Sequence, residues 1–323
     1  MKLADIYAHF QEDIFTIERE LEEAVQARHN ILRKASVHLL KAGGKRIRPV
    51  FVLLAGKFGT YDVNVLKHIA VALELIHMAS LVHDDVIDDA DLRRGKKTIK
   101  SQWDNRIAMY TGDYMFAKAV QTATYFDDPN IHQIISNAIN EMCLGEVEQI
   151  RDQYNPNQHL RIYFRRIKRK TALLIAVSCQ LGALAAKADP AIVKKLYYFG
   201  YYVGMSFQIT DDVLDFVGTE EQLGKPAGSD LLQGNVTLPA LYALHHDMHA
   251  KRLIEQVLAD RGNNSVHMEE VIAAIVSSGG IDYALSISDL YLKKAMRMLD
   301  HLPDDEPKQF LQEIANYIGR RKF

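Results

Sequence analysis

The residues best suited to chemistry are two matching groups of aspartates. Asp-Asp-Val-Ile-Asp occupies positions 84–88, and Asp-Asp-Val-Leu-Asp occupies positions 211–215. An apolar, helix-like run precedes each group, so the first and last aspartates of a group should lie on one helix face. Several carboxylates that face one cavity repel each other unless cations lie between them. The repeated pattern therefore predicts a magnesium–diphosphate site, because Mg²⁺ is often bound by a few carboxylates together with substrate phosphates.

Basic residues lie close to both groups in the sequence. The segment 43–49, Gly-Gly-Lys-Arg-Ile-Arg-Pro, places three of them after a flexible glycine pair, where they could bind a diphosphate. Arg93 and Arg94 follow the first aspartate group, and Lys170 precedes a long apolar run. These side chains supply positive charge for two anionic groups.

Composition excludes several other classes of protein. The chain has 323 residues and is 48% hydrophobic, which is ample for a buried core. Its net charge of -2 gives no general attraction to nucleic acid. Cys143 and Cys179 are the two cysteines, and neither belongs to a C-x-x-C pattern, so we expect no disulfide framework or zinc site. A reduced, cytoplasmic location fits this composition.

No segment has the pattern of a membrane span. Asp5, Glu12 and Asp13 interrupt the apolar residues of the N-terminus, so a signal peptide is not expected. The best membrane candidate, 171–186, is shorter than the ~20 residues that a spanning helix needs. It also contains polar side chains such as Gln180, and we interpret it as a buried helix.

Helical periodicity runs along almost the whole chain, and no strand-like alternation with hairpin turns is present. We therefore predict an all-α protein of about a dozen helices in one domain, residues 1–323. The irregular stretch 218–235 follows the second aspartate group and is predicted to be a lid. The other predicted breaks between helices are 43–44, 59–62, 127–130, 155–158 and 261–264.

Seven motifs together resemble the trans-isoprenyl (polyprenyl) diphosphate synthases, most closely the large catalytic component of the bacterial heptaprenyl enzymes. They run in the family's order across most of the chain, at 43–49, 74–95, 110–114, 145–149, 165–174, 207–216 and 224–241. The resemblance implies an isoprenoid synthase helical bundle with a central active-site cavity. It also implies head-to-tail condensation, in which an allylic diphosphate ionises and isopentenyl diphosphate adds to the carbocation.

The resemblance further implies a metal and a set of catalytic residues. Two to three Mg²⁺ ions would accompany the allylic diphosphate, with Asp84, Asp88 and Asp211 as the main ligands. The full expected set of metal ligands is Asp84, Asp85, Asp88, Asp211 and Asp215, and Asp212 would lie nearby. The expected catalytic residues are Asp84, Asp88, Asp211, Lys170, Thr171 and Gln208.

Substrate contacts follow from the same resemblance. Lys45, Arg48, His77 and Arg94 are expected to bind isopentenyl diphosphate. Arg93, Lys170 and Lys225 are expected to contact the allylic diphosphate. Thr171 and Gln208 are neutral dipoles near the developing cation, which they can stabilise without acting as nucleophiles.

Product length is expected to depend on Ala79 and Ser80. In the family, bulky residues at these positions close the hydrocarbon tunnel, whereas here both are small. A long all-trans product is therefore expected, with heptaprenyl favoured by the overall resemblance. Farnesyl diphosphate is the expected primer, and menaquinone side chains are the expected destination.

Two departures from the family pattern concern the partner and the C-terminus. Many homodimeric relatives have lysine at the position of Asn235, whereas two-component heptaprenyl enzymes resemble this chain there. A smaller non-identical subunit is therefore the expected partner. A homodimer remains open. The basic end, 319–323, either folds over the active site or is disordered.

Three alternative functions remain to be weighed. The first is a self-sufficient homodimeric octaprenyl or geranylgeranyl diphosphate synthase. The second is a terpene cyclase, which would not need the isopentenyl diphosphate contacts of 43–49, His77 and Arg94. The third is a non-catalytic isoprenoid-binding subunit, which the two intact aspartate groups argue against.

Overall fold

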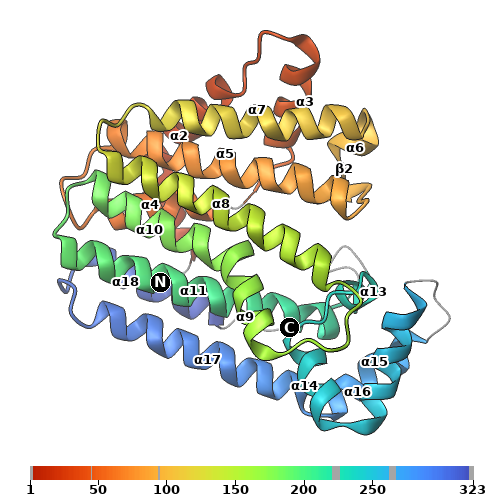
Figure 1. The fold of residues 1–323 in the computed structure, drawn as a ribbon. Coiled ribbons are helices and arrows are strands. Elements are labelled where there is room, and N and C mark those ends of the chain that lie inside the picture. Colours follow the sequence, from red (N-terminus) through yellow and green to blue (C-terminus); the bar gives the residue numbers. More distant parts are fainter. Residues whose placement is uncertain (1–2, 45, 94, 220–225, 262–266, 320–323) are drawn as a thin grey trace. The chain divides into compact units, whose positions relative to one another are not determined.

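The chain is almost entirely helical, as predicted (Figure 1). The computed structural model describes residues 3–44, 46–93, 95–219, 226–261 and 267–319. In that part of the chain the only strands are the two-residue β1 (Leu92–Arg93) and β2 (Lys96–Lys97), which form an antiparallel hairpin. The hairpin was not predicted, because two-residue strands carry no alternating pattern.

Packing divides the chain into two compact units. The first comprises Met1–Ile139, Leu174–Gly200 and His301–Glu313, and the second comprises Asn140–Leu173, Tyr201–Asp300 and Ile314–Phe323. Four helices have residues in both units: α8 (Pro129–Asp152), α10 (Leu173–Ala185), α11 (Pro190–Val217) and α18 (Glu306–Gly319). A single domain over residues 1–323 stays a prediction, and each unit is described by itself.

The first unit is built around α5 (Val63–Ile87). This helix packs against α7 (Asn105–Ala123), α4 (Ile47–Gly56) and α2 (Gln11–Ala24), and Figure 1 shows α5 and α7 side by side. Most of its apolar residues between Leu66 and Val82 are buried, as expected for a helix that is apolar on most of its surface. Burial of each Leu or Ile side chain stabilises the unit by about 1.5–3 kcal/mol.

Local chemistry sets both ends of α5. Asp62 caps the beginning, because its carboxylate accepts a hydrogen bond from the backbone N–H of Asn64 at 2.9 Å. The helix ends at Ile87, and Asp89 adopts a left-handed conformation with φ of 52°. The first aspartate group therefore lies in the last turn of α5 and at its C-cap.

Four further helices belong to the first unit or begin at its boundary. They are α1 (Leu3–His9), α3 (Asn30–Lys41), α6 (Ile99–Gln102) and α10 (Leu173–Ala185). Helix α3 packs against α6 and α7. Residues of α10 are largely buried, which confirms the interpretation of 171–186 as a buried helix.

The second unit is centred on α14 (Leu238–His246), which packs against four other helices. These partners are α9 (Leu160–Ile167), α15 (Met248–Asp260), α16 (Met268–Ser277) and α17 (Gly280–Leu299). A π-helical turn, η1 (Lys168–Ala172), follows α9, and the short helix α13 (Ser229–Leu232) lies in the stretch predicted to be irregular. The described residues thus form more helices than the dozen expected, since short helices carry little periodicity.

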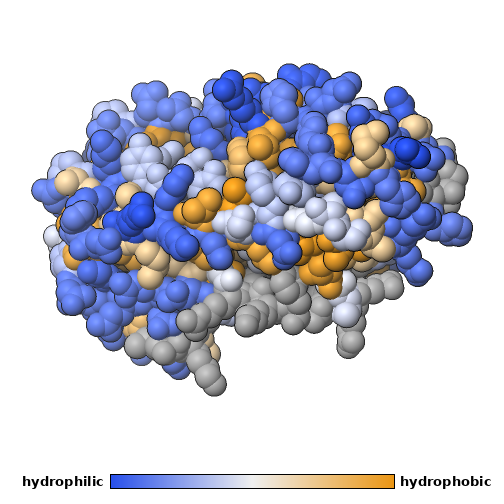
Figure 2. All heavy atoms as spheres, turned by 90° about the horizontal axis from the view of Figure 1, so that it is seen from below, coloured by the Kyte–Doolittle hydropathy of each residue, from blue (hydrophilic) through white to orange (hydrophobic). Residues whose placement is uncertain are grey.

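By length and composition, α5 is the one described helix that could cross a membrane, while α16 and α17 pass the same test only as a pair bent by 59°. However, 67% of the apolar window of α5 is buried within the protein, as in the core helix of a folded unit. The molecular face in Figure 2 shows mostly hydrophilic side chains with smaller apolar areas between them.

Candidate active site

The three aspartates of the first group differ in their exposure to solvent. Asp84 and Asp85 are buried, with exposed fractions of 9% and 2%, whereas Asp88 is half-buried. The backbone N–H of Asp88 donates to the carbonyl oxygen of Asp84 at 2.8 Å, so the two residues lie one helical turn apart. Their carboxylates are therefore suited to act together on one ligand.

Asp85 is bound by a protein cation. Both Nε and Nη2 of Arg93 lie 2.7 Å from its Oδ1, and the β1–β2 hairpin brings Arg93 to this position. Burial raises the pKa of Asp85, and the adjacent guanidinium opposes that rise. Arg93, predicted to contact the allylic diphosphate, is thus also the partner of a motif aspartate.

A narrow pocket of about 20 Å³ lies beside this pair in the first unit. It brings together predicted residues from separate motifs, and its lining includes Gly43, Arg46, Glu74, His77 and Arg93. The predicted diphosphate contacts Lys45 and Arg94 lie outside the described residues.

Arg46 is one of the three basic residues of 43–49, but its guanidinium is already paired. Its Nη1 donates to Glu74 at 3.0 Å, and its Nε lies 3.6 Å from Glu18. Glu74 is buried, and Arg46 has a left-handed backbone with φ of 45°. Arg46 therefore holds the glycine turn against α5, which differs from the expected grip on a diphosphate. Arg48 is half-buried in the first turn of α4.

The second aspartate group is also divided by its environment. Asp211 is exposed, whereas Asp212 and Asp215 are buried. The Asp212 carboxylate accepts from the Tyr163 hydroxyl at 2.6 Å and from Nε2 of Gln208 at 2.8 Å. Burial raises the pKa of Asp212 to about 7, and these two hydrogen bonds oppose the rise.

Gln208 links this group to the π-helical turn. Its Oε1 accepts a hydrogen bond from the Thr171 hydroxyl at 2.5 Å, while its amide nitrogen donates to Asp212. The structure thus brings the two predicted neutral dipoles together. Sequence spacing associated Gln208 with Asp211, but its amide contacts Asp212, one turn further along α11.

Asp215 holds the segment that follows α11. Its carboxylate accepts from the Ser229 hydroxyl at 3.0 Å and from the backbone N–H of Asp230 at 3.2 Å. The charge of Asp230 also contributes to the raised pKa of Asp212. Asp230 was not singled out from the sequence, although its motif, 224–241, was. Lys225 lies outside the described residues, as does 220–225 of the predicted lid.

Acidic residues of α8 position the cations of η1. The Arg169 guanidinium binds Glu141 at 2.9 Å and Glu148 at 2.6 Å. Nζ of Lys170 lies 3.2 Å from Oε1 of Gln149. Motif 145–149 signalled this region, but sequence alone assigned it no role. π-helical turns occur frequently at functional sites.

Gly145 permits this close approach. A Cβ atom at Gly145 would lie 2.7 Å from the Cβ of Arg169, closer than real Cβ atoms come. The motif therefore combines a glycine for backbone contact with side chains that bind the following basic turn.

Asn235 occupies the position at which many relatives have lysine. Its backbone N–H donates to the carbonyl oxygen of Asp230 at 2.8 Å. Its side-chain Oδ1 is buried and has no hydrogen-bond partner among the described residues.

The predicted tunnel residues lie in α5. Ala79 is fully buried, and the Ser80 hydroxyl donates to the His77 carbonyl oxygen at 2.9 Å.

Magnesium is the cofactor implied by the resemblance. Within the described part of the chain, no three His, Cys, Asp or Glu side chains are grouped to bind a metal ion. Mg²⁺ commonly takes one or two carboxylates and completes its octahedron with phosphate oxygens and water. Asp84, Asp88 and Asp211 carry oxygens of this kind.

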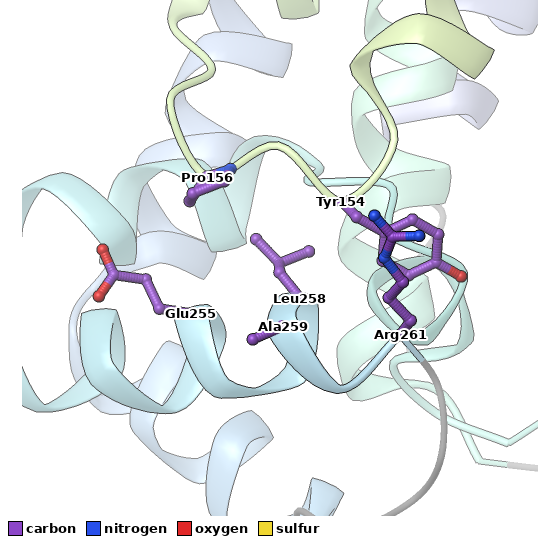
Figure 3. A pocket seen from close by; sticks show the side chains of 6 residues that line it. All are labelled: Tyr154, Pro156, Glu255, Leu258, Ala259 and Arg261. Atoms are coloured by element: carbon purple, nitrogen blue, oxygen red, sulfur yellow. The ribbon is translucent and has the colours of Figure 1, made fainter.

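A second pocket, of about 270 Å³, lies in the second unit between the loop after α8 and the end of α15 (Figure 3). The Arg261 guanidinium lies 6.0 Å from the ring centre of Tyr154 there. No predicted site residue lines this pocket, so it is separate from the aspartate groups. Its lining is Tyr154, Pro156, Glu255, Leu258, Ala259 and Arg261.

Comparisons with known proteins agree with these features. The polyprenyl synthetase family model matches residues 29–275. Heptaprenyl diphosphate synthase component 2 of Geobacillus stearothermophilus is 59% identical over 100% of both chains. The Bacillus subtilis (strain 168) protein of the same name is 57% identical over 100% of this chain and 92% of the relative.

A solved structure is also similar over nearly the full length. The crystal structure of heptaprenyl diphosphate synthase from Staphylococcus aureus has a TM-score of 0.91 and 44% sequence identity, covering 97% of this chain and 99% of that chain. These matches confirm the predicted fold class and exclude a non-catalytic subunit or a cyclase as the better description. The chain belongs to the polyprenyl synthetase family and is a trans-prenyltransferase with that family's all-α fold.

Proposed function

We propose that this chain adds isopentenyl diphosphate units head-to-tail to farnesyl diphosphate and forms all-trans heptaprenyl diphosphate. The observation that carries the proposal is 59% identity over the full length of a heptaprenyl diphosphate synthase component 2. The long product would supply menaquinone side chains, and the reaction would take place in the cytoplasm.

Asp84, Asp88 and Asp211 are the proposed direct ligands of two or three Mg²⁺ ions. Asp85 and Asp215 would support them, because Arg93 and Ser229 already bind their carboxylates. When bound, the ions supply positive charge to the departing diphosphate, which lowers the barrier to ionisation.

The basic residues divide between the two substrates. Arg48 and His77, with Lys45 and Arg94, would bind isopentenyl diphosphate. Support comes from the pocket in the first unit, whose lining contains His77 and residues that are close in sequence to Lys45 and Arg94. Arg93, Lys170 and Lys225 would contact the allylic diphosphate, and Gln149 orients the Lys170 ammonium.

Thr171 and Gln208 would stabilise the allylic cation. Their hydrogen bond fixes two neutral oxygen atoms beside the basic turn η1. A fixed dipole of this kind lowers the energy of developing charge without offering a strong nucleophile.

A smaller, non-identical subunit is the proposed partner. The name "component 2" of the relatives from Geobacillus stearothermophilus and Bacillus subtilis supports this proposal. Asn235 also favours a two-component enzyme over a homodimer, because many homodimeric relatives have lysine at this position.

The test is product analysis with labelled isopentenyl diphosphate and farnesyl diphosphate. The chain is assayed alone and with the small subunit from the same source, each with Mg²⁺. Heptaprenyl diphosphate formed only by the mixture is the expected result. Octaprenyl or geranylgeranyl diphosphate formed by the chain alone would establish the homodimeric alternative, and no condensation in either sample would refute the proposal.

A further inference from the structure

The carboxylate of Asp212 is buried and bound on both sides. Its exposed fraction is 3%, and that of Tyr163 is 0%. Oδ2 accepts from the Tyr163 hydroxyl at 2.6 Å, and Oδ1 accepts from Nε2 of Gln208 at 2.8 Å. Each oxygen of the Asp212 carboxylate therefore has a protein donor.

Tyr163 is itself fixed by its surroundings. Its ring lies 5.4 Å from that of Phe164 in an edge arrangement, and the Arg166 guanidinium lies 5.7 Å from its ring centre. Arg166 in turn donates to the Val236 carbonyl oxygen at 2.7 Å. The Tyr163 hydroxyl is therefore a rigid donor that sets the rotation of the Asp212 carboxylate.

The two ends of the Gln208 amide have opposite polarity. Oδ1 of Asp212 accepts a hydrogen bond from Nε2, so the NH₂ end of the amide faces Asp212. With that end at Asp212, the carbonyl oxygen must face Thr171, whose hydroxyl donates to it. The oxygen and nitrogen ends of an amide are similar in shape, so packing alone does not choose between them.

We propose that Tyr163 and Asp212 are positioning residues that hold the carbonyl oxygen of Gln208 on the side of Thr171. This inference rests on the proposed function, in which that oxygen stabilises the allylic cation. The carbonyl end carries partial negative charge, whereas an inverted amide would present partial positive charge to the cation. Tyr163 and Asp212 thus act on the reaction through Gln208.

Asp212→Asn tests the proposal by inverting the amide. When the Tyr163 hydroxyl continues to donate, now to the amide oxygen at position 212, the amide nitrogen at that position faces Gln208. Gln208 must then accept through Oε1 and turn its NH₂ end toward Thr171, whose hydroxyl can also accept. We expect kcat to fall by about 10²-fold, as after loss of one preorganised dipole. The KM for both substrates and the Mg²⁺ concentration for half-maximal activity should stay unchanged.

Tyr163→Phe is the second variant, because it keeps the buried ring and removes only the hydroxyl. It should lower kcat severalfold with the same unchanged KM values, and it carries the test if Asp212→Asn does not fold. Tyr291→Phe is the matched control, since this ring packs near Phe164 and Tyr202 and has no hydrogen bond to Asp212. Asp282→Asn, at an exposed site on α17, controls for loss of one carboxylate.

Three outcomes would overturn the proposal in the assembled enzyme. An unchanged kcat in both variants would show that the amide orientation is irrelevant. A raised Mg²⁺ requirement in Asp212→Asn would show that Asp212 binds metal. A loss of kcat that matches the loss of folded protein, measured by thermal unfolding, would leave only a structural role. A wild-type enzyme without condensation activity refutes the proposed function instead.

Discussion

At the scale of single residues, identical motif positions have different surroundings. In the first group Arg93 binds Asp85, and in the second group Tyr163 binds Asp212 and Ser229 binds Asp215. Such contacts orient the carboxylates, as the hydrogen-bond partners of metal-binding side chains commonly do.

Ala79→Tyr should shorten the product toward farnesyl or geranylgeranyl length. Ala79 is fully buried one turn before the first aspartate group, and the proposed function places its side chain beside the growing chain. Chromatography of the dephosphorylated products measures the change. Ala79→Ser is the control, and an unaltered length distribution in the tyrosine variant would contradict the tunnel assignment. Overpacking could cost about 1–3 kcal/mol, so thermal unfolding is measured in parallel.

His68 should make folding stability depend on pH. Burial lowers its pKa below 6.5, with Glu20 opposing and Lys67 adding to the effect, and its ring stacks on Tyr125 at 3.8 Å. The unfolded state therefore binds the proton more tightly. The contribution of His68 to the free energy of unfolding is fully present above pH 6.5. It is lost as the pH falls through the lower pKa that His68 has in the folded state.

His68→Gln should remove this part of the pH dependence. Urea unfolding of the variant and the wild type, at pH values on both sides of 6.5, measures the difference. His29→Gln, at an exposed site, is the control. Equal pH slopes for His68→Gln and wild type would show that His68 makes no such contribution.

At the scale of elements, the second half of α8 and the turn η1 form one charged assembly. Glu148 binds both Arg165 and Arg169, at 3.0 and 2.6 Å, and Glu141 binds Arg169 from the preceding turns. These pairs orient the basic residues around Lys170. Their contribution is positional more than energetic, since partly exposed ion pairs stabilise a fold by only about 0–1 kcal/mol.

Gly145→Ala should separate α8 from η1. The added Cβ would overlap the Arg169 side chain, so we expect a loss of about 1–3 kcal/mol of folding free energy. The KM for the allylic diphosphate should also rise, because Lys170 loses its contact with Gln149. Calorimetry and initial rates measure both effects. Asn140→Ala, at an exposed site on the same helix, is the control and should change neither the folding free energy nor the KM. If Gly145→Ala behaves like this control, the close approach of Gly145 to Arg169 is unimportant.

At the scale of the whole molecule, each unit carries one aspartate group and its own supporting contacts. Positions 84–88 belong to the first unit and 211–215 to the second. Each unit is held by packed apolar helices and not by a clustered metal site among the described residues. Metal binding is thus expected to serve the reaction more than the fold.

Removal of divalent cations should abolish turnover and leave the fold intact. With EDTA, condensation should stop, while far-UV circular dichroism and the substrate-free melting temperature should change little. Added Mg²⁺ should restore activity. Unfolding of the protein by EDTA would indicate a structural metal instead, since such sites couple metal binding to folding.

The sequence alone determined the helical fold class, several of the breaks between helices and the residues of both aspartate groups. These features depend on local periodicity, turn residues and short motifs, all of which lie within one segment of the chain. Helix α5 is the clearest example, because its apolar run, its Asp62 cap and its terminal aspartates are all contiguous.

Only the tertiary structure decided how these residues are used. Arg46 pairs with Glu74, Arg93 with Asp85, and Tyr163 with Asp212, so residues that look equivalent in a motif acquire different partners. Each of these contacts joins different elements. Spacing along the chain does not encode such contacts, because they depend on how helices pack and on which polar groups that packing buries.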